Sequence, residues 1–211
     1  MFWSGNLMLD DVLEQCYAFL ETHPTEFIVF AVKQDHGGET VGGFQALMKA
    51  YIDKAPQYWL LTDNIPTVGQ ARGKLVLMRR YSDAKDLKDQ AGISFIWRDQ
   101  KNRDNAVFAE DSVKNERYNL IVQDRYKYDA DDKWNAFLKA AEVSGGQNGR
   151  GRLALNFLST NGNTAYGHPY KYAKKLNKKL LSVDSPKLSG WVIVDFGTAD
   201  IAKRIYEENF K

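Results

Sequence analysis

Five short apolar runs, each followed at once by polar or charged residues, constrain the fold of this 211-residue chain more than any other feature. The runs cover residues 27–32, 75–78, 120–122, 153–158 and 191–194. Apolar runs of this length are typical of parallel strands that are buried on both faces. In parallel α/β barrels the chemistry lies where the strands end, so we expect functional residues directly after each run.

Amphipathic helices are predicted between these runs. Apolar residues at helical spacing predict the first helix from Leu9 to Leu20, and it should end near His23-Pro24 because proline disfavours helix in the preceding residue. Further helices are predicted over 40–53 and around 134–141, 172–180 and 201–206, whereas 56–72 and 82–105 are expected to be loops. Since no linker or repeat interrupts this order, we expect one domain, residues 1–211, of five β/α units.

Five strands cannot close a barrel that usually has eight. Either the sheet is open and doubly wound, or about three strands that belong before this sequence are missing. An open sheet predicts a glycine-rich ligand-binding turn early in the chain, and the sequence has none there. The glycine-rich stretch 144–149 lacks the preceding strand and the lysine of a phosphate loop. We therefore expect an incomplete α/β barrel.

Composition excludes two classes of protein. The 29 basic and 27 acidic residues nearly balance, so the chain gives no case for nucleic-acid binding. The lysines at 171–179 are spaced like the solvated face of an amphipathic helix. No apolar stretch approaches the roughly 20 residues of a membrane span.

Charged and aromatic residues directly follow the predicted strands. Three carboxylates follow three separate strands and are expected at one rim, where they could accept sugar hydroxyls, bind metal or orient a histidine. Two cationic side chains and one aromatic ring, suited to phosphate and polyol ligands, join them. The candidates are Asp35, Asp124, Asp195, Lys33, Arg80 and Tyr126. Among the histidines, His23 and His168 are expected to be structural, whereas His36 is expected at the rim and could be functional.

Four segments carry a resemblance to a known family. Residues 23–36 (HPTEFIVFAVKQDH), 72–81 (RGKLVLMRRY), 122–127 (VQDRYK) and 190–197 (GWVIVDFG) resemble the X domain of bacterial phosphatidylinositol-specific phospholipase C, in the family's order. The resemblance implies a distorted, TIM-type (β/α) barrel. It also implies a reaction in which the inositol 2-hydroxyl attacks phosphorus, releasing diacylglycerol and forming inositol 1,2-cyclic phosphate by acid–base catalysis.

The resemblance assigns roles to the strand-end residues. Lys33, Arg80, Asp124 and Tyr126 would hold the inositol ring with Asp35 beside them, and Asp195 would orient the general-base histidine. The two catalytic histidines and the phosphate-binding arginine of the family belong to early strands and have no counterpart in this sequence. We therefore expect an N-terminally incomplete domain that is inactive as written.

Two other functions stay open at this point. One is a non-catalytic remnant that binds inositol phosphates or glycans. The other is a glycosidase with a pair of carboxylates, which is disfavoured because Lys33 and Arg80 are mixed with the acids.

The resemblance also implies partners and cofactors. The partner would be phosphatidylinositol or an inositol phosphate, with transient contact to a membrane surface. Trp59 and Trp97 are candidates for that contact, although burial in the core is the interpretation we favour. No metal or other cofactor is expected, because Lys33 stands where calcium-dependent relatives carry an acidic ligand. The compartment stays open, and the protein would be secreted if a signal peptide precedes this sequence.

Overall fold

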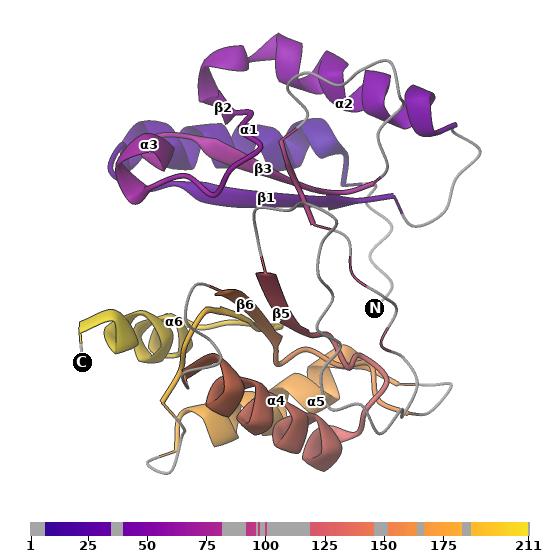
Figure 1. Ribbon diagram of the computed structural model, residues 1–211, viewed down its shortest axis with the longest axis vertical. Helices are drawn as coiled ribbons and strands as arrows, with labels where there is room; N and C mark the ends of the chain where they lie inside the picture. Colours follow the sequence, from indigo (N-terminus) through magenta and orange to yellow (C-terminus); the bar gives the residue numbers. More distant parts are fainter. Residues whose placement is uncertain are drawn as a thin grey trace. The chain divides into compact units, whose positions relative to one another are not determined.

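The computed structural model describes residues 7–34, 40–81, 92–95, 97, 100, 119–145, 152–163, 167–182 and 187–210. The chain divides into two compact units, Met1–Ile96 and Trp97–Lys211, coloured indigo to magenta and magenta to yellow in Figure 1. Each unit contains a sheet of parallel strands with helices packed against it. Asp35 and His36 lie outside the described residues.

The first unit is built around strand β3. Its elements are α1 (Leu9–Thr22), β1 (Ile28–Lys33), α2 (Val41–Lys54), the 3₁₀ turn η1 (Pro56–Tyr58), β2 (Trp59–Leu60), α3 (Val68–Ala71), β3 (Leu75–Arg80) and β4 (Ile93–Ser94). Strand β3 pairs in parallel with β1 from Ile28↔Leu75 to Lys33↔Arg80. It also pairs in parallel with β2 and β4.

Local signals fix the ends of the first two helices. Helix α1 ends at Thr22, immediately before His23-Pro24, as predicted. Helix α2 begins after Thr40, whose hydroxyl accepts a hydrogen bond of 3.0 Å from the amide of Gly43. Such an N-cap satisfies one of the amides that a helix leaves without an internal partner.

The core of the first unit lies on one face of its sheet. Helix side chains pack there against alternate residues of β1 and β3; the buried members are Leu13, Leu20, Ile52, Trp59, Leu75 and Leu77, with Ile28, Phe30 and Val32 packed against them. Because side chains alternate along a strand, Lys33 and Arg80 belong to the opposite face. The helices therefore cover one face, and the two cations stand on the other.

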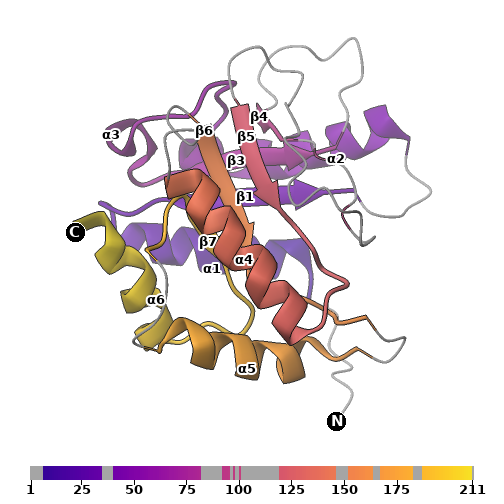
Figure 2. The ribbon, with the colours of Figure 1, turned by 60° about the horizontal axis from the view of Figure 1, so that its bottom comes forward.

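The second unit repeats the parallel arrangement. Its elements are β5 (Asn119–Gln123), α4 (Ala130–Gly145), β6 (Arg152–Phe157), α5 (Pro169–Leu180), β7 (Trp191–Ile193), α6 (Ala199–Tyr206) and the 3₁₀ turn η3 (Glu207–Phe210). The strand order is β5-β6-β7, and both pairings are parallel. Helix α4 packs along β5 and β6, as Figure 2 shows.

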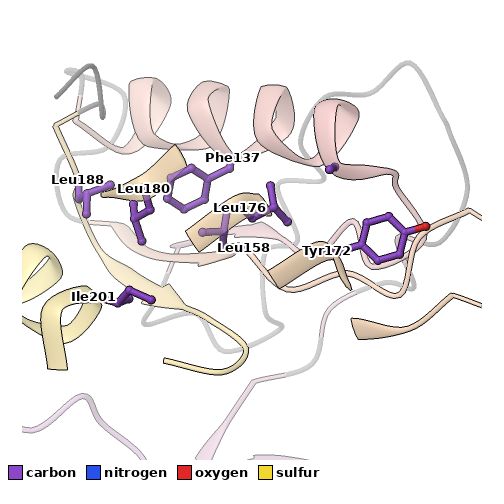
Figure 3. Packing of buried hydrophobic residues seen from close by; sticks show 8 residues of the cluster. Phe137, Leu158, Tyr172, Leu176, Leu180, Leu188 and Ile201 are labelled. Atoms are coloured by element: carbon purple, nitrogen blue, oxygen red, sulfur yellow. The ribbon is translucent and has the colours of Figure 1, made fainter. Parts of the chain in front are cut away.

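Helices α4, α5 and α6 share one apolar core. Side chains from all three helices meet the end of β6, as seen in Figure 3; the buried members are Ala130, Phe137, Leu158, Tyr172, Leu176, Leu180, Leu188 and Ile201. Leu176, Leu180 and Ile201 come from the helices predicted around 172–180 and 201–206, and they lie in this core. No helix within the described ranges is long and apolar enough to cross a membrane.

The expected fold class, a parallel α/β arrangement, is confirmed, and all five predicted strands are present. Two expected loops were wrong in part. Segment 56–72 contains β2 and α3, and segment 82–105 contains β4. Strands β2 and β4 have two residues each, too few for a hydrophobic pattern, and hydrogen bonding to β3 is what defines them. The single domain over 1–211 stays a prediction.

Candidate functional site

Lys33 and Arg80 lie side by side at the carboxyl ends of β1 and β3. They are register partners in the parallel pair, so both project from the same face of the sheet. Lys33 is exposed and Arg80 is half-buried. Two adjacent cations at one strand edge make a place suited to phosphate or sugar oxygens, and guanidinium groups bind such oxygens through paired donors.

Asp124 follows β5 in the second unit and is held by two side chains. The indole Nε1 of Trp97 donates to its Oδ2 over 3.0 Å. Its backbone amide donates to Oε1 of Gln100 over 2.9 Å, and the side-chain amide of Gln100 in turn donates to the carbonyl of Val122 over 3.0 Å. These bonds fix the chain direction at the strand end and the orientation of the carboxylate.

Tyr126 lies in the turn that connects β5 to α4. Its amide donates to the carbonyl of Asp124 over 3.0 Å. Its carbonyl accepts hydrogen bonds from the amide of Asn161 over 2.8 Å and from the hydroxyl of Thr160 over 3.1 Å. The turn that carries Tyr126 is therefore tied to the segment that follows β6.

Asp195 follows β7, and its backbone is tied to α5. The side-chain amide of Asn177 donates to the carbonyls of Asp195 over 3.0 Å and of Phe196 over 3.3 Å. Phe196 has a φ of 52°, in the left-handed region that costs non-glycine residues energy. Partial burial raises the pKa of the Asp195 carboxyl, and the positive charge of Lys133 opposes that rise.

A buried polar network lies under the carboxyl ends of β5 and β6. The ammonium Nζ of Lys133, on α4, donates to Oε1 of Gln123 over 2.7 Å. The side-chain amide of Gln123 donates to Oδ1 of Asn156 over 2.9 Å and to the carbonyl of Phe157 over 2.7 Å. The side-chain amide of Asn156 donates to the carbonyl of Phe137 over 3.0 Å. The network joins α4 to both strands.

Lys133 is an ionisable group whose environment shifts its pKa strongly. Its pKa is lowered to about 7, mainly by burial, and the charge of Arg125 acts in the same direction. The carboxylates Asp124 and Asp195 act in the opposite direction. Asp124 and Asp195 follow two parallel strands of the β5-β6-β7 sheet, so they lie at the same edge of that sheet.

The structure thus groups the predicted residues within each unit. Lys33 and Arg80 form one pair, and Asp124, Tyr126 and Asp195 follow strands β5 and β7. Trp59 and Trp97 are both buried, which confirms the interpretation that we favoured. Within the described ranges no cluster of His, Cys, Asp or Glu is placed to hold a metal ion.

Two histidines have local partners. Nδ1 of His23 lies 2.9 Å from the hydroxyl of Thr22 and 3.1 Å from the carbonyl of Phe19, so the ring closes the end of α1. His168 is the N-cap of α5, and its carbonyl accepts a hydrogen bond of 3.0 Å from the amide of Lys171. Both positions agree with the structural roles expected for them.

Sequence reasoning missed Gln100, Gln123, Lys133 and Asn156. A signal for Lys133 existed, because Ala130, Lys133, Phe137 and Ala141 recur at helical spacing and all are buried. For Gln100 no local signal exists, since its role depends on contact with a strand more than 20 residues away.

The fold is that of a parallel α/β protein, and the chain is similar to bacterial phosphatidylinositol-specific phospholipases C. Among the curated proteins, the chain is 28% identical over 221 residues to the 1-phosphatidylinositol phosphodiesterase of Staphylococcus aureus strain Newman. The match covers 95% of this chain and 68% of the relative. The resemblance inferred from the four segments is therefore confirmed.

Solved structures agree with the sequence match. A structure of the phosphatidylinositol-specific phospholipase C of Staphylococcus aureus, studied for its membrane binding, superposes with a TM-score of 0.74 at 27% identity, covering 95% of this chain and 70% of that one. The Listeria monocytogenes enzyme of the same name has the same fold, with a TM-score of 0.67 at 23% identity and coverage of 97% and 71%. No family model matches the chain.

Proposed function

We propose that this chain binds the inositol phosphate headgroup of phosphatidylinositol and carries the substrate-binding residues of a phosphatidylinositol-specific phospholipase C. The observation that carries the proposal is the similarity to a 1-phosphatidylinositol phosphodiesterase over 95% of the chain. The strand-end positions of the candidate residues support it, since ligands of parallel α/β folds bind where the strands end.

The cationic pair of the first unit is suited to the phosphate oxygens of the substrate. Lys33 and Arg80 stand next to each other in register, so their donors can converge on neighbouring oxygens of one headgroup. Hydrogen bonds to charged groups contribute roughly 1.5–3 kcal/mol each. The guanidinium of Arg80 is the better anchor of the two, because its donors form a rigid, planar fork.

The residues of the second unit are suited to the hydroxyls and one face of a polyol ring. Asp124 accepts hydrogen bonds, and its orientation is fixed by Trp97. Tyr126 offers an aromatic face to the polyol ring, on a turn that Thr160 and Asn161 hold in place. Asp195 would orient the imidazole of a general base, the task of a carboxylate beside a catalytic histidine.

In the cleavage reaction, the inositol 2-hydroxyl would attack phosphorus and lose its proton to a base. The bond from phosphorus to the diacylglycerol oxygen would break, and that oxygen would gain a proton from an acid. Each proton-transfer role contributes a factor of roughly 10² to 10⁴. The ring of His23 closes the end of α1 through Thr22 and Phe19, and the resemblance assigns neither catalytic histidine to this sequence. We therefore expect the 211 residues by themselves to release no more than traces of diacylglycerol.

Calorimetric titration of myo-inositol 1-phosphate tests the proposal. The intact chain should bind it saturably, and Arg80→Ala and Asp124→Asn should each weaken binding roughly tenfold or more, since 1.4 kcal/mol is a factor of ten. Lys175→Ala, an exposed position on α5, is the matched control and should bind like the intact chain. Equal affinities in all four proteins would overturn the assignment, as would binding of inorganic phosphate as tight as that of the inositol phosphate.

A further inference from the structure

Lys133 is an unusual residue because its side chain is fully buried in the interior of the second unit. Lysines are almost never fully buried unless they are paired, since removing an ammonium from water costs several kcal/mol. Its position on the buried stripe of α4, four residues before Phe137, places it in the layer between the helix and the sheet.

Neutral side chains make the direct contacts of Lys133. Gln123 of β5 accepts its hydrogen bond, and Asn156 of β6 holds Gln123 from the other side. The described residues provide no carboxylate within ion-pair distance of its Nζ. One neutral acceptor offsets little of the free-energy cost of burying an ammonium. Charged groups farther away must therefore offset the rest.

Charged groups act on Lys133 from the ends of β5 and β7, whereas β6 contributes the neutral Asn156. Asp124 and Arg125 follow β5, and Asp195 follows β7. On α5, Lys179 is paired with Asp131 over 2.7 Å at the exposed side of α4. The remaining ionisable group of that core is the phenol of Tyr172, which is buried. Two carboxylates and one guanidinium therefore act on this ammonium from the carboxyl edge of the sheet.

Lys133 also controls geometry at this edge. Oε1 of Gln123 accepts a hydrogen bond from the ammonium of Lys133 and another, over 3.0 Å, from the backbone amide of Arg125. This second bond fixes the first residues after β5, and Asp124 lies between the two bonded residues. The ammonium thus acts on Asp124 through the same amide oxygen that shapes the strand end.

We propose that Lys133 is a positioning residue: through Oε1 of Gln123, which it shares with the amide of Arg125, its buried side chain holds Asp124 in place at the carboxyl edge of the second sheet, and its charge acts on Asp195 at the same edge. The charge coupling is a property of the folded chain, and only its use in substrate binding rests on the proposed function. At low dielectric such coupling extends beyond direct contact, because water does not screen the charges.

Lys133→Met tests the coupling, since methionine has a similar length and no charge. The titration of the Asp195 carboxyl is followed by carbon-13 NMR, with the signal assigned from Asp195→Asn. Without the ammonium, the midpoint of Asp195 should move to higher pH. Lys139→Met, at an exposed position on the same helix, should leave the midpoint unchanged. An unchanged midpoint in folded Lys133→Met would overturn the proposal.

A reciprocal measurement covers the case in which Lys133→Met does not fold. By linkage, Asp195 must act on Lys133 as strongly as Lys133 acts on Asp195. In Asp195→Asn, the pKa of Lys133, read from its side-chain NMR signals, should fall below the intact chain's value of about 7. An unmoved Lys133 titration would contradict the coupling. Neither readout uses substrate or turnover, so a failed inositol phosphate titration would not be mistaken for failure here.

Discussion

The ammonium nitrogen of Lys133 lies 2.7 Å from Oε1 of Gln123, and this contact joins α4 to the end of β5. Because burial lowers the pKa of Lys133 to about 7, the protonation state of this contact changes near neutral pH. The stability of the second unit and the charge at its strand ends are therefore linked to pH by one internal residue.

Stability should rise with pH above neutrality through Lys133. Between pH 7 and 10.5 the unfolded lysine holds its proton and the native one does not, so the free energy of unfolding increases with pH. In that window this one group raises the free energy of unfolding by at most about 1.4 kcal/mol per pH unit. Below pH 7 it adds no pH dependence. Urea unfolding at several pH values, compared between the intact chain and Lys133→Met, measures it.

The comparison has a defined outcome. Lys133→Met should be more stable than the intact chain at pH near 6, and the difference should shrink as the pH rises past about 7. Lys139→Met should follow the intact chain at every pH. Curves for Lys133→Met and the intact chain that run parallel across the whole range would show that Lys133 does not titrate in the folded protein.

Trp97→Phe should destabilise the chain and weaken inositol phosphate binding together. The change keeps an aromatic ring but removes the hydrogen bond to the Asp124 carboxylate, a loss of roughly 1.5–3 kcal/mol. Trp134→Phe is the control, since its indole stacks on Phe137 at 5.6 Å and makes no hydrogen bond with a described residue. If Trp97→Phe lost stability but bound inositol phosphate as before, Trp97 would have no role in ligand binding.

Asn177→Ala should loosen the segment that carries Asp195. The variant loses bonds to two carbonyls, and Phe196 then has to keep its positive φ without them. We expect a loss of roughly 1–2 kcal/mol in the free energy of unfolding, measured in urea. The exposed neighbour Lys178→Ala should cost less than about 0.5 kcal/mol. Similar costs for both variants would mean that these bonds contribute nothing.

Gly162→Ala should be strongly destabilising, and Gly69→Ala should not. Gly162 has a φ of 76°, and a Cβ there would collide with the Tyr172 ring of the core. Gly69 lies within α3, where a Cβ would meet nothing within 4 Å, so alanine should stabilise by roughly 0.5–1 kcal/mol. Thermal unfolding of the two variants compares them directly. A Gly162→Ala protein that melts with the parent would contradict the packing of this turn against α5.

Strand positions could be predicted because buried parallel strands leave continuous apolar runs, as at β3 and β6. Helix ends could be predicted where a residue has a local effect, as at Pro24 and Thr40. The strands β2 and β4 could not, since two residues carry no period and the pairing with β3 decides their conformation.

Some residues of the candidate site could be predicted from the sequence and others could not. Lys33, Arg80, Asp124 and Asp195 could be predicted because they directly follow apolar runs. Trp97 could not be assigned its contact, because the bond to Asp124 joins residues 27 positions apart and depends on the tertiary fold. The assignment of the predicted residues to one inositol site stays a prediction, and Asp35 lies outside the described residues.

Headgroup selectivity tests the central claim most directly. Short-chain phosphatidylinositol, kept below its micelle concentration, is titrated into the 211-residue chain and followed by NMR, with phosphatidylcholine of the same chain length as the control lipid. The account predicts saturable binding of phosphatidylinositol, a roughly tenfold or greater loss of affinity in Arg80→Ala, and no saturable binding of phosphatidylcholine. Equal affinities for the two lipids, or an Arg80→Ala protein that binds phosphatidylinositol as the intact chain does, would contradict it.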